Sequence, residues 1–173
     1  MIIVFEGADC LGKSTLAKRV SELLNVQIVK KDLGWMSKSD LTGERIEEHA
    51  RAFANTLTQL KSSCEFIVDR MGLSSVVYSN VYDRNVDTSW VSELIEDPYV
   101  FFVVITSAPS RTHLWIDSIK SRGEDLIDHL SLPRINDGFI DIAEREAELI
   151  QLEAFNPIDE MAMKVIAAVS DAR

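Results

Sequence analysis

Residues 7–15 of the 173-residue chain read Gly-Ala-Asp-Cys-Leu-Gly-Lys-Ser-Thr and follow the apolar run Met1-Ile-Ile-Val-Phe5. The stretch matches the pattern G-x-x-x-x-G-K-S/T of a phosphate-binding loop, and it lies after a predicted strand and before a predicted helix, as that loop requires. The two glycines let the backbone curl so that N–H groups point at phosphate oxygens, and the positive end of the helix dipole faces the same place. The residues predicted to bind a nucleoside triphosphate are Gly7, Ala8, Asp9, Cys10, Leu11, Gly12, Lys13, Ser14 and Thr15.

Two side chains of this loop have predicted tasks of their own. Lys13 is positioned to reach the β- and γ-phosphates, and the hydroxyl of Ser14 suits a Mg²⁺ ion. A glycine-containing turn that matches the pattern by chance is the alternative. The strand–loop–helix setting favours the phosphate loop.

The composition indicates a globular protein with one domain over residues 1–173. Its 46% hydrophobic and 27% charged residues are ordinary for this class, and the chain shows no repeats or linkers. The net charge of −10 argues against a nucleic-acid partner, because phosphate backbones are held by clustered Lys and Arg. We therefore expect small-molecule nucleotides as partners, bound in a local positive pocket.

The same sequence predicts a cytoplasmic protein without a membrane partner. Its longest apolar run, Val100 to Ile105, is much shorter than a membrane span, and its beginning lacks the layout of a signal peptide. Cys10 and Cys64 are too few and too far apart for a disulfide framework or a zinc site, which suits a reducing compartment.

Near-continuous apolar strands alternate with amphipathic helices along the chain. The predicted strands are Ile2–Phe5, Val26–Val29, Glu65–Asp69, Tyr99–Thr106, fully buried, and Ile150–Ala154. The predicted helices are Ser14–Leu24, Thr42–Leu60, Ser74–Val81, Ser89–Glu96, Ser110–Arg122, 133–147 and Ile158–Ser170, with irregular segments at 31–42 and 123–132. This alternation predicts an α/β fold with a doubly wound, five-stranded parallel sheet flanked by helices.

Ligands of such sheets bind where the strands end at their carboxyl edge. Four segments should surround one crevice there: residues 6–15, 30–32, 69–75 and 106–109. At the end of the third strand, Asp69 is suited to hold the metal through water, and Arg70 is suited to bind a second phosphate with two N–H groups. A helix-capping Asp beside a surface Arg is the alternative, but the nearby phosphate loop favours the functional role.

With Phe5-Glu6-Gly7-Ala8-Asp9 before the loop, and with Asp69-Arg70 followed by Ser74-Ser75 and Tyr78, the sequence resembles the thymidylate kinase family. Weaker similarity continues through Arg122-Gly123 and Gly138-Phe139. The resemblance implies a nucleoside monophosphate kinase fold of the phosphate-loop type, which transfers the γ-phosphoryl group of ATP to dTMP with Mg²⁺. It also implies a homodimer.

The resemblance assigns roles to residues of the two motifs. Asp9 is similar to the loop aspartate that faces the deoxyribose and the acceptor phosphate, and Arg70 to the arginine that clamps this phosphate. Tyr78 is similar to the aromatic residue that leaves no room for a ribose 2′-hydroxyl, and Ser74 and Ser75 border the base pocket. Lys13, Asp9 and Arg70 are therefore expected to be catalytic.

The predicted helices supply candidates for two further roles, binding of the base and a cation in the lid. Arg51 and Phe53 match the residues that hydrogen-bond to the base and stack on it, although Arg45 competes for the first role and Phe53 is equally suited to the core. Arg122 is the candidate catalytic cation of a lid over residues 122–133, because the phosphate loop carries no arginine. A simple charge at the helix end is an equally good explanation of Arg122.

Several positions depart from the family pattern. Met71 replaces an aromatic residue or His, Ser79-Asn80 replaces a Gln or Thr, residues 30–32 lack an arginine, and the lid has a single one. Phosphoryl transfer remains expected, but the base is left open. The acceptor is dTMP, a 5-substituted dUMP or another deoxynucleoside monophosphate.

Three other functions compete. A deoxynucleoside kinase also has Glu-Gly before its loop and an acidic residue before an arginine, and Asp32 would then be the base. A phosphate-loop switch or nucleic-acid-dependent ATPase fits the acidic charge poorly. A non-catalytic dimer module fits the intact Lys13, Ser14, Asp69 and Arg70 poorly.

Overall fold

Five parallel strands form one sheet in the order β2-β3-β1-β4-β5. The computed structural model describes residues 1–30, 43–122 and 131–172. The strands are β1 (Ile2–Gly7), β2 (Gln27–Lys30), β3 (Phe66–Asp69), β4 (Val100–Thr106) and β5 (Ile150–Glu153). The predicted fold class, a doubly wound, five-stranded parallel sheet flanked by helices, is confirmed.

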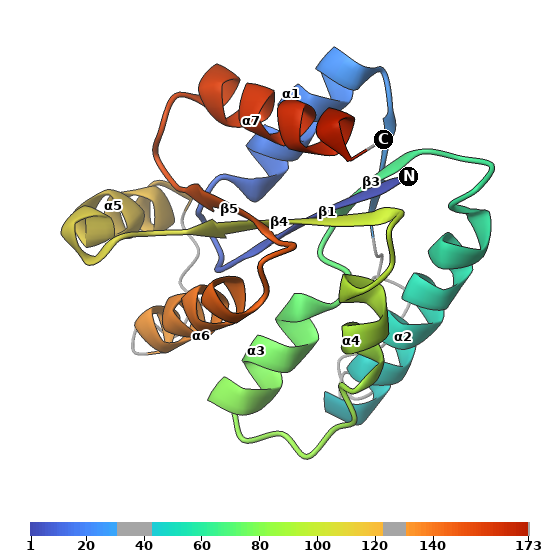
Figure 1. Cartoon of the computed structure of the whole chain (residues 1–173). Coiled ribbons are helices and arrows are strands. Elements are labelled where there is room, and N and C mark those ends of the chain that lie inside the picture. The colour runs from blue at the N-terminus through green and yellow to red at the C-terminus, as the bar shows by residue number, and fades with distance from the viewer. Residues whose placement is uncertain (31–42, 123–130, 173) are drawn as a thin grey trace.

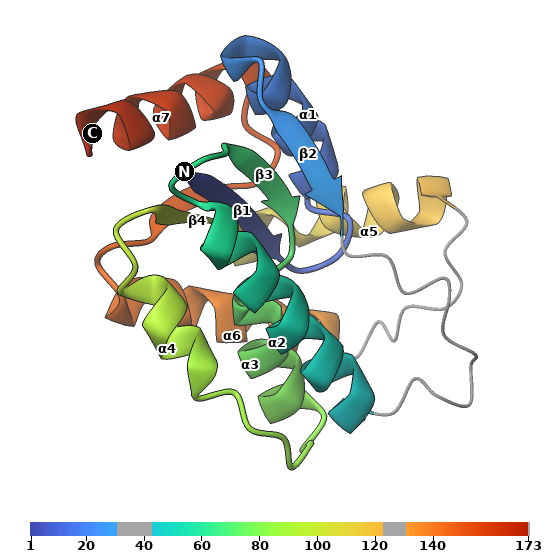
Figure 2. The ribbon, with the colours of Figure 1, turned by 90° about the vertical axis from the view of Figure 1, so that its right-hand side faces the viewer.

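Helices cover both faces of this sheet, as Figures 1 and 2 show. On one face lie α1 (Lys13–Leu24) and α7 (Ile158–Asp171). On the other lie α2 (Gly43–Leu60), α3 (Leu73–Val81), α4 (Trp90–Ile95) and α6 (Leu132–Arg145). The helix α5 (Thr112–Arg122) follows a short 3-10 turn and lies at the end of the sheet toward which β4 points (Figure 1).

The centre of the core is β1, between β3 and β4. All of its residues are buried, and Ile2, Ile3, Val4 and Phe5 expose no surface. A central parallel strand is covered on both faces, so its sequence is apolar without alternation. The strand order changes direction at β1, which places the carboxyl end of β1 at the crevice where such folds bind ligands.

The element boundaries differ from the predicted ones by at most two residues. Helix α1 ends at Asn25, which takes up the left-handed conformation with φ 55°. One detail was wrong: Tyr99 precedes β4 rather than belonging to it, and 51% of the residue is exposed. Its position in the turn before the strand explains this exposure. The irregular segment 31–42 and most of the predicted lid lie outside the described residues.

None of the described helices has the length and hydropathy that a bilayer span needs.

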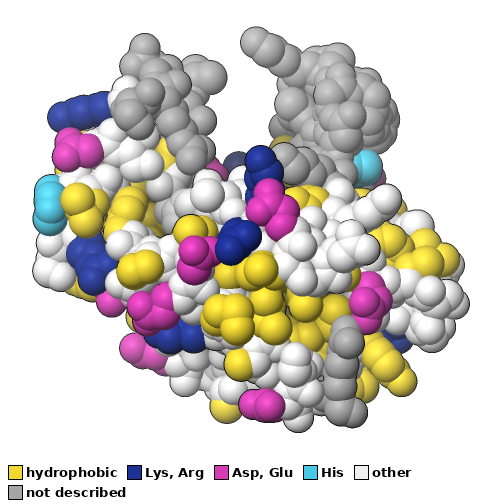
Figure 3. Space-filling model, turned by 90° about the horizontal axis from the view of Figure 1, so that it is seen from above, with side chains coloured by type: hydrophobic (Ala, Val, Ile, Leu, Met, Phe, Trp, Pro, Cys, Tyr) yellow, Lys and Arg dark blue, Asp and Glu magenta, His cyan; other side chains and the backbone are white. Residues whose placement is uncertain are grey.

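Figure 3 shows the face formed by α1 and α7, where Lys and Arg side chains lie scattered among acidic and hydrophobic ones. No basic stripe crosses the described part of this face. The absence of a nucleic-acid partner stays a prediction, as does the single domain.

Candidate active site

The phosphate loop packs closely against the neighbouring strand. Gly7 has φ 137°, and a β-carbon on it would lie 2.2 Å from the backbone oxygen of Ile105 in β4. Gly12 has φ 87° and begins α1 in the left-handed conformation. At residue 7, only glycine tolerates both the positive φ and the close approach of the β4 backbone. The two glycines therefore shape the concave backbone that the sequence predicts for a phosphate site.

Lys13 is folded into this loop. Its residue is 6% exposed, and its Nζ donates a hydrogen bond to the backbone oxygen of Ala8. Burial, and after it the Arg70 guanidinium, lowers the pKa of Lys13 to about 7. A buried ammonium is stabilised by an anion. The loop is therefore an environment in which Lys13 gains from a bound phosphate.

Ser14 and Asp69 lie together at the mouth of the loop. The Ser14 hydroxyl donates to Oδ2 of Asp69 over 2.7 Å, although the two residues are 55 positions apart. No group of three or more His, Cys, Asp or Glu that fits a metal occurs among the described residues. A hydroxyl and a carboxylate are nevertheless the ligand set that fits Mg²⁺ in a nucleotide site, because this ion keeps several waters and takes its other ligands from phosphates.

Arg70 lies just after β3 and turns back toward the loop. Its backbone has φ 69°, and its N–H donates to the Phe5 oxygen over 3.1 Å. The guanidinium donates through Nη2 to Asp9 and through Nη1 to the Ser74 hydroxyl over 2.8 Å. It also lies 5.5 Å from the ring centroid of Tyr78. Burial acts to lower the pKa of Arg70, but the Tyr78 hydroxyl and the Asp9 carboxylate outweigh burial, so the pKa is raised.

Asp9 is the acidic centre of this cluster. Burial acts to raise its pKa, but the charges of Arg70 and Lys13 outweigh burial and the pKa lies below its ordinary value. Tyr78 donates its hydroxyl to Oδ2 of Asp9 over 3.3 Å. Burial raises the pKa of Tyr78 to about 12, so the phenol stays protonated at neutral pH. The ion pair of Asp9 and Arg70 and the neutral Tyr78 thus form one connected polar group.

Two cavities meet at this group. The loop cavity has a volume of about 130 Å³ and is lined by Asp9, Cys10, Gly12, Lys13, Ser14, Asp69 and Arg70. The α2–α3 cavity has a volume of about 270 Å³ and is lined by Asp9, Gly43, Ile46, Glu47, Arg70, Ser74, Ser75, Tyr78, Ser79 and Arg84. Both share Asp9 and Arg70. The structure thus brings the predicted phosphate loop and the predicted clamp residues to adjoining spaces.

Two predicted substrate residues do not line the α2–α3 cavity. Arg51 is exposed, lies 3.7 Å from Asp87 through Nη1 and Oδ2, and lines a neighbouring cavity that shares Glu47 with the α2–α3 cavity. Phe53 is half-buried and packs against the core. Both lie further along α2 than Ile46 and Glu47, which do line the cavity. The side chain of Arg122, the predicted lid cation, lies outside the described residues.

Glu6 is an anchor that the sequence reading left without a role. Its side chain is fully buried, and Oε1 accepts 2.9 Å hydrogen bonds from the backbone N–H groups of Met71 and Gly72. The hydroxyl of Ser74 donates to its Oε2. A carboxylate at a helix N-terminus satisfies N–H groups that the helix cannot. Glu6 therefore fixes α3, and with it the start of the cavity wall.

Helix α5 supports the loop from another side. The indole N–H of Trp115 donates to the backbone oxygen of Asp9 over 2.7 Å, and the hydroxyl of Ser118 donates to that of Cys10 over 3.1 Å. The sequence predicts neither hydrogen bond, because a Trp at helical spacing indicates only a residue of the hydrophobic core. Both bonds hold the loop backbone beside the shared Asp9.

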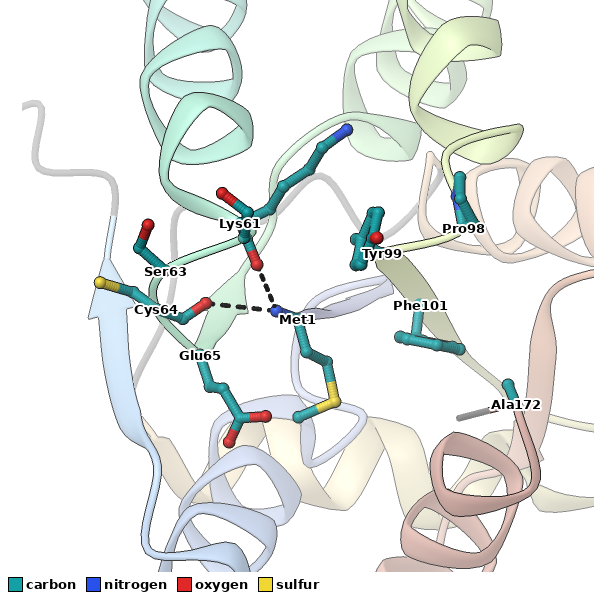
Figure 4. A pocket seen from close by; sticks show the side chains of 10 residues that line it. Met1, Lys61, Ser63, Cys64, Glu65, Pro98, Tyr99, Phe101 and Ala172 are labelled. Atoms are coloured by element: carbon teal, nitrogen blue, oxygen red, sulfur yellow. Dashed lines mark hydrogen bonds between the residues drawn. The ribbon is translucent and has the colours of Figure 1, made fainter.

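A larger cavity of about 560 Å³ lies at the opposite edge of the sheet, around Met1, Lys61, Cys64, Tyr99 and Phe101 (Figure 4). The amino group of Met1 donates there to the backbone oxygens of Lys61 and Cys64, over 2.8 and 3.2 Å. This cavity shares no residue with the loop cavity. The size of a cavity therefore does not locate the site; the phosphate loop does.

No family model matches the sequence, and no curated protein matches it. Several solved structures match the fold. Deoxyadenosine kinase from M. mycoides with dCMP and dCDP bound gives a TM-score of 0.67 at 19% identity, over 99% of this chain and 100% of that one. The YorR protein of Bacillus subtilis in complex with phosphorylated GDP gives 0.65 at 23%, over 98% and 96%.

A third match is more distant in sequence. A gluconokinase from Sinorhizobium meliloti gives a TM-score of 0.66 at 14% identity, over 98% of this chain and 91% of that one. At these identities the likeness concerns the fold alone. The chain therefore has the fold of phosphate-loop kinases that act on small molecules.

Proposed function

We propose that the protein transfers the γ-phosphoryl group of ATP to the 5′-phosphate of a deoxynucleoside monophosphate, dTMP or a 5-substituted dUMP, giving the diphosphate. The observation that carries this proposal is the position of Arg70, which lines both the loop cavity and the α2–α3 cavity. An acceptor phosphate beside this guanidinium faces the donor phosphates above Lys13. In-line transfer needs this alignment more than it needs covalent help from the protein.

Each part of the site has a role in this reaction. The loop amides and Lys13 hold the phosphates of ATP, and Ser14 with Asp69 holds Mg²⁺. The bound ion neutralises charge on the β- and γ-phosphates. Arg70 exchanges part of its contact with Asp9 for the acceptor phosphate, to which it can donate two parallel hydrogen bonds. Tyr78 packs against the sugar.

A deoxynucleoside kinase is the second candidate, and the match to deoxyadenosine kinase favours it. Such a kinase must take a proton from a 5′-hydroxyl, whereas a phosphate acceptor is already anionic and needs no base. Asp32, the base expected for that reaction, lies outside the described residues, and the lowered pKa of Asp9 makes this carboxylate a weak proton acceptor. The Arg70 guanidinium, which lines both cavities and suits an anionic acceptor, favours the monophosphate.

The test is a panel of nucleosides and nucleoside monophosphates, including 5-substituted dUMP, with ATP and Mg²⁺ and with formation of ADP as the readout. The proposal expects ADP with dTMP or a 5-substituted dUMP and little with any nucleoside. ADP formation with thymidine or deoxyadenosine alone would support the second candidate and reject the first. The homodimer and the cytoplasmic location stay predictions.

A further inference from the structure

The α2–α3 cavity is lined by two opposite charges that do not pair with each other among the described residues. Glu47 comes from α2, and Arg84 comes from the segment after α3. Among the described residues no ion pair joins them, although both line the same space of about 270 Å³. Neither residue lines the loop cavity, whereas Asp9 and Arg70, beside which the acceptor phosphate is placed, line both cavities.

Glu47 is buried, with 8% of the residue exposed. Its Oε1 accepts a 2.8 Å hydrogen bond from the indole N–H of Trp90 in α4, which is itself 5% exposed. A buried carboxylate is costly unless its oxygens are hydrogen-bonded. Within the described part of the chain, Trp90 is its hydrogen-bond partner, and it occupies one oxygen. Oε2 is left as an acceptor for a ligand.

Arg84 lies beside the start of α2, and among the described residues its contacts leave side-chain donors available. Its backbone N–H donates to the Ser79 oxygen over 2.8 Å, and its guanidinium lies 5.1 Å from the ring centroid of Tyr82. Its aliphatic part packs at Gly43, where a β-carbon would lie 3.3 Å from Cδ. A guanidinium has five N–H donors and no acceptor. The cavity therefore offers both a carboxylate acceptor and guanidinium donors.

We infer that Glu47 and Arg84 read the base of the acceptor nucleotide. Glu47 accepts a hydrogen bond from the N3–H of a thymine- or uracil-type ring, and Arg84 donates to a carbonyl oxygen beside it. This inference rests on the proposed function and names the residues that recognise its base. An N–H beside a carbonyl oxygen is complementary to a carboxylate acceptor and a guanidinium donor that line the same cavity. Cytosine bound in the same orientation, with its N3 as an acceptor, would place a lone pair against the carboxylate.

The isosteric variant Glu47→Gln tests this directly. The Trp90 N–H requires an acceptor, so it keeps the amide oxygen of the new side chain, and the amide NH2 replaces Oε2. A donor then faces the base where an acceptor stood. A site that hydrogen-bonds a substrate group discriminates strongly against an analogue that lacks it, so the base preference should shift.

The experiment measures the dissociation constants of dTMP and dCMP by calorimetry, and their turnover with ATP. Wild type should prefer dTMP by about tenfold or more, and Glu47→Gln should reduce this preference by about tenfold. The matched control is Glu48→Gln, which removes the same charge from the next residue of α2, outside the cavity. It should keep the preference of wild type.

An unchanged preference in Glu47→Gln would overturn the inference. An equal loss of affinity for dTMP and dCMP would also overturn it, because Glu47 would then only support the fold through Trp90. If wild type phosphorylates monophosphates without preferring dTMP over dCMP, the inference fails and the proposed function stands. If it phosphorylates no monophosphate, both fail together.

Discussion

Arg70, at the end of β3, forms an ion pair with Asp9 of the phosphate loop, 61 residues earlier in the sequence. The pair lies where the loop cavity and the α2–α3 cavity meet. It therefore links the part of the molecule that holds donor phosphates to the part that is shaped for an acceptor.

Replacing Arg70 by Ala should weaken the binding of the monophosphate far more than the binding of ATP. Losing a bidentate, charge-assisted contact costs about 1.5–3 kcal/mol, or about tenfold to a hundredfold in affinity. Equilibrium binding of dTMP and of ATP measures both effects in one variant. The control is Arg145→Ala at an exposed position of α6, which should leave the affinities for dTMP and ATP unchanged. Equal losses of affinity for dTMP and ATP in Arg70→Ala would contradict the clamp role.

Tyr78→Ala should admit ribonucleotides. The Tyr78 ring lies beneath the Arg70 guanidinium and lines the cavity where the sugar is placed. Removing it opens room for a 2′-hydroxyl, so the ratio of kcat/KM for UMP and dUMP should rise toward one. Tyr78→Phe keeps the ring and should keep the deoxy preference. Strict deoxy preference in Tyr78→Ala would place sugar discrimination at another residue.

Glu6→Gln should destabilise the fold. The buried carboxylate accepts from two backbone N–H groups and a hydroxyl, and an amide would place a donor against at least one of them. We expect a loss of about 2–3 kcal/mol in the free energy of unfolding, from denaturant titration. The exposed Glu144→Gln on α6 should stay close to wild type. Equal stability of both variants would show that Glu6 does not anchor α3.

Asp9 should stabilise the fold in a pH-dependent way. Its pKa in the folded protein is lowered, so its contribution is present above the ordinary value of 3.8 and is lost as pH falls through the folded value. The stability difference between wild type and Asp9→Asn should therefore shrink below about pH 3.8. Denaturant titrations from pH 7 to pH 3 measure it. A difference that stays constant over this range would mean that the Arg70 pair adds no stability.

Much of the fold follows from the sequence because its signals are local. The spacing of Gly7, Gly12 and Lys13 suits one backbone shape, and that shape requires a strand before it and a helix after it. The apolar run of β4 predicts a buried strand without knowledge of its neighbours. Asn25 predicts the end of α1, since it tolerates the left-handed conformation.

Contacts between distant elements could not be predicted in the same way. Arg51 and Phe53 lie four and six residues beyond Glu47 on α2, about 6–9 Å further along the helix axis, and neither lines the α2–α3 cavity. Glu47 looks in the sequence like an ordinary exposed helix residue. Its role depends on Trp90, 43 residues away, whose N–H keeps a carboxylate buried at the cavity wall. The hydrophobic periodicity of a sequence predicts which face of a helix is buried, but it does not predict which other element packs against that face.

The most direct test of the account follows the transferred phosphoryl group itself. The protein is incubated with Mg²⁺, ATP labelled at the γ-phosphate, and an equimolar mixture of dTMP and thymidine, and the labelled products are separated. The account predicts that the label appears in dTDP. Label found instead in newly formed dTMP, or only in inorganic phosphate, would contradict it.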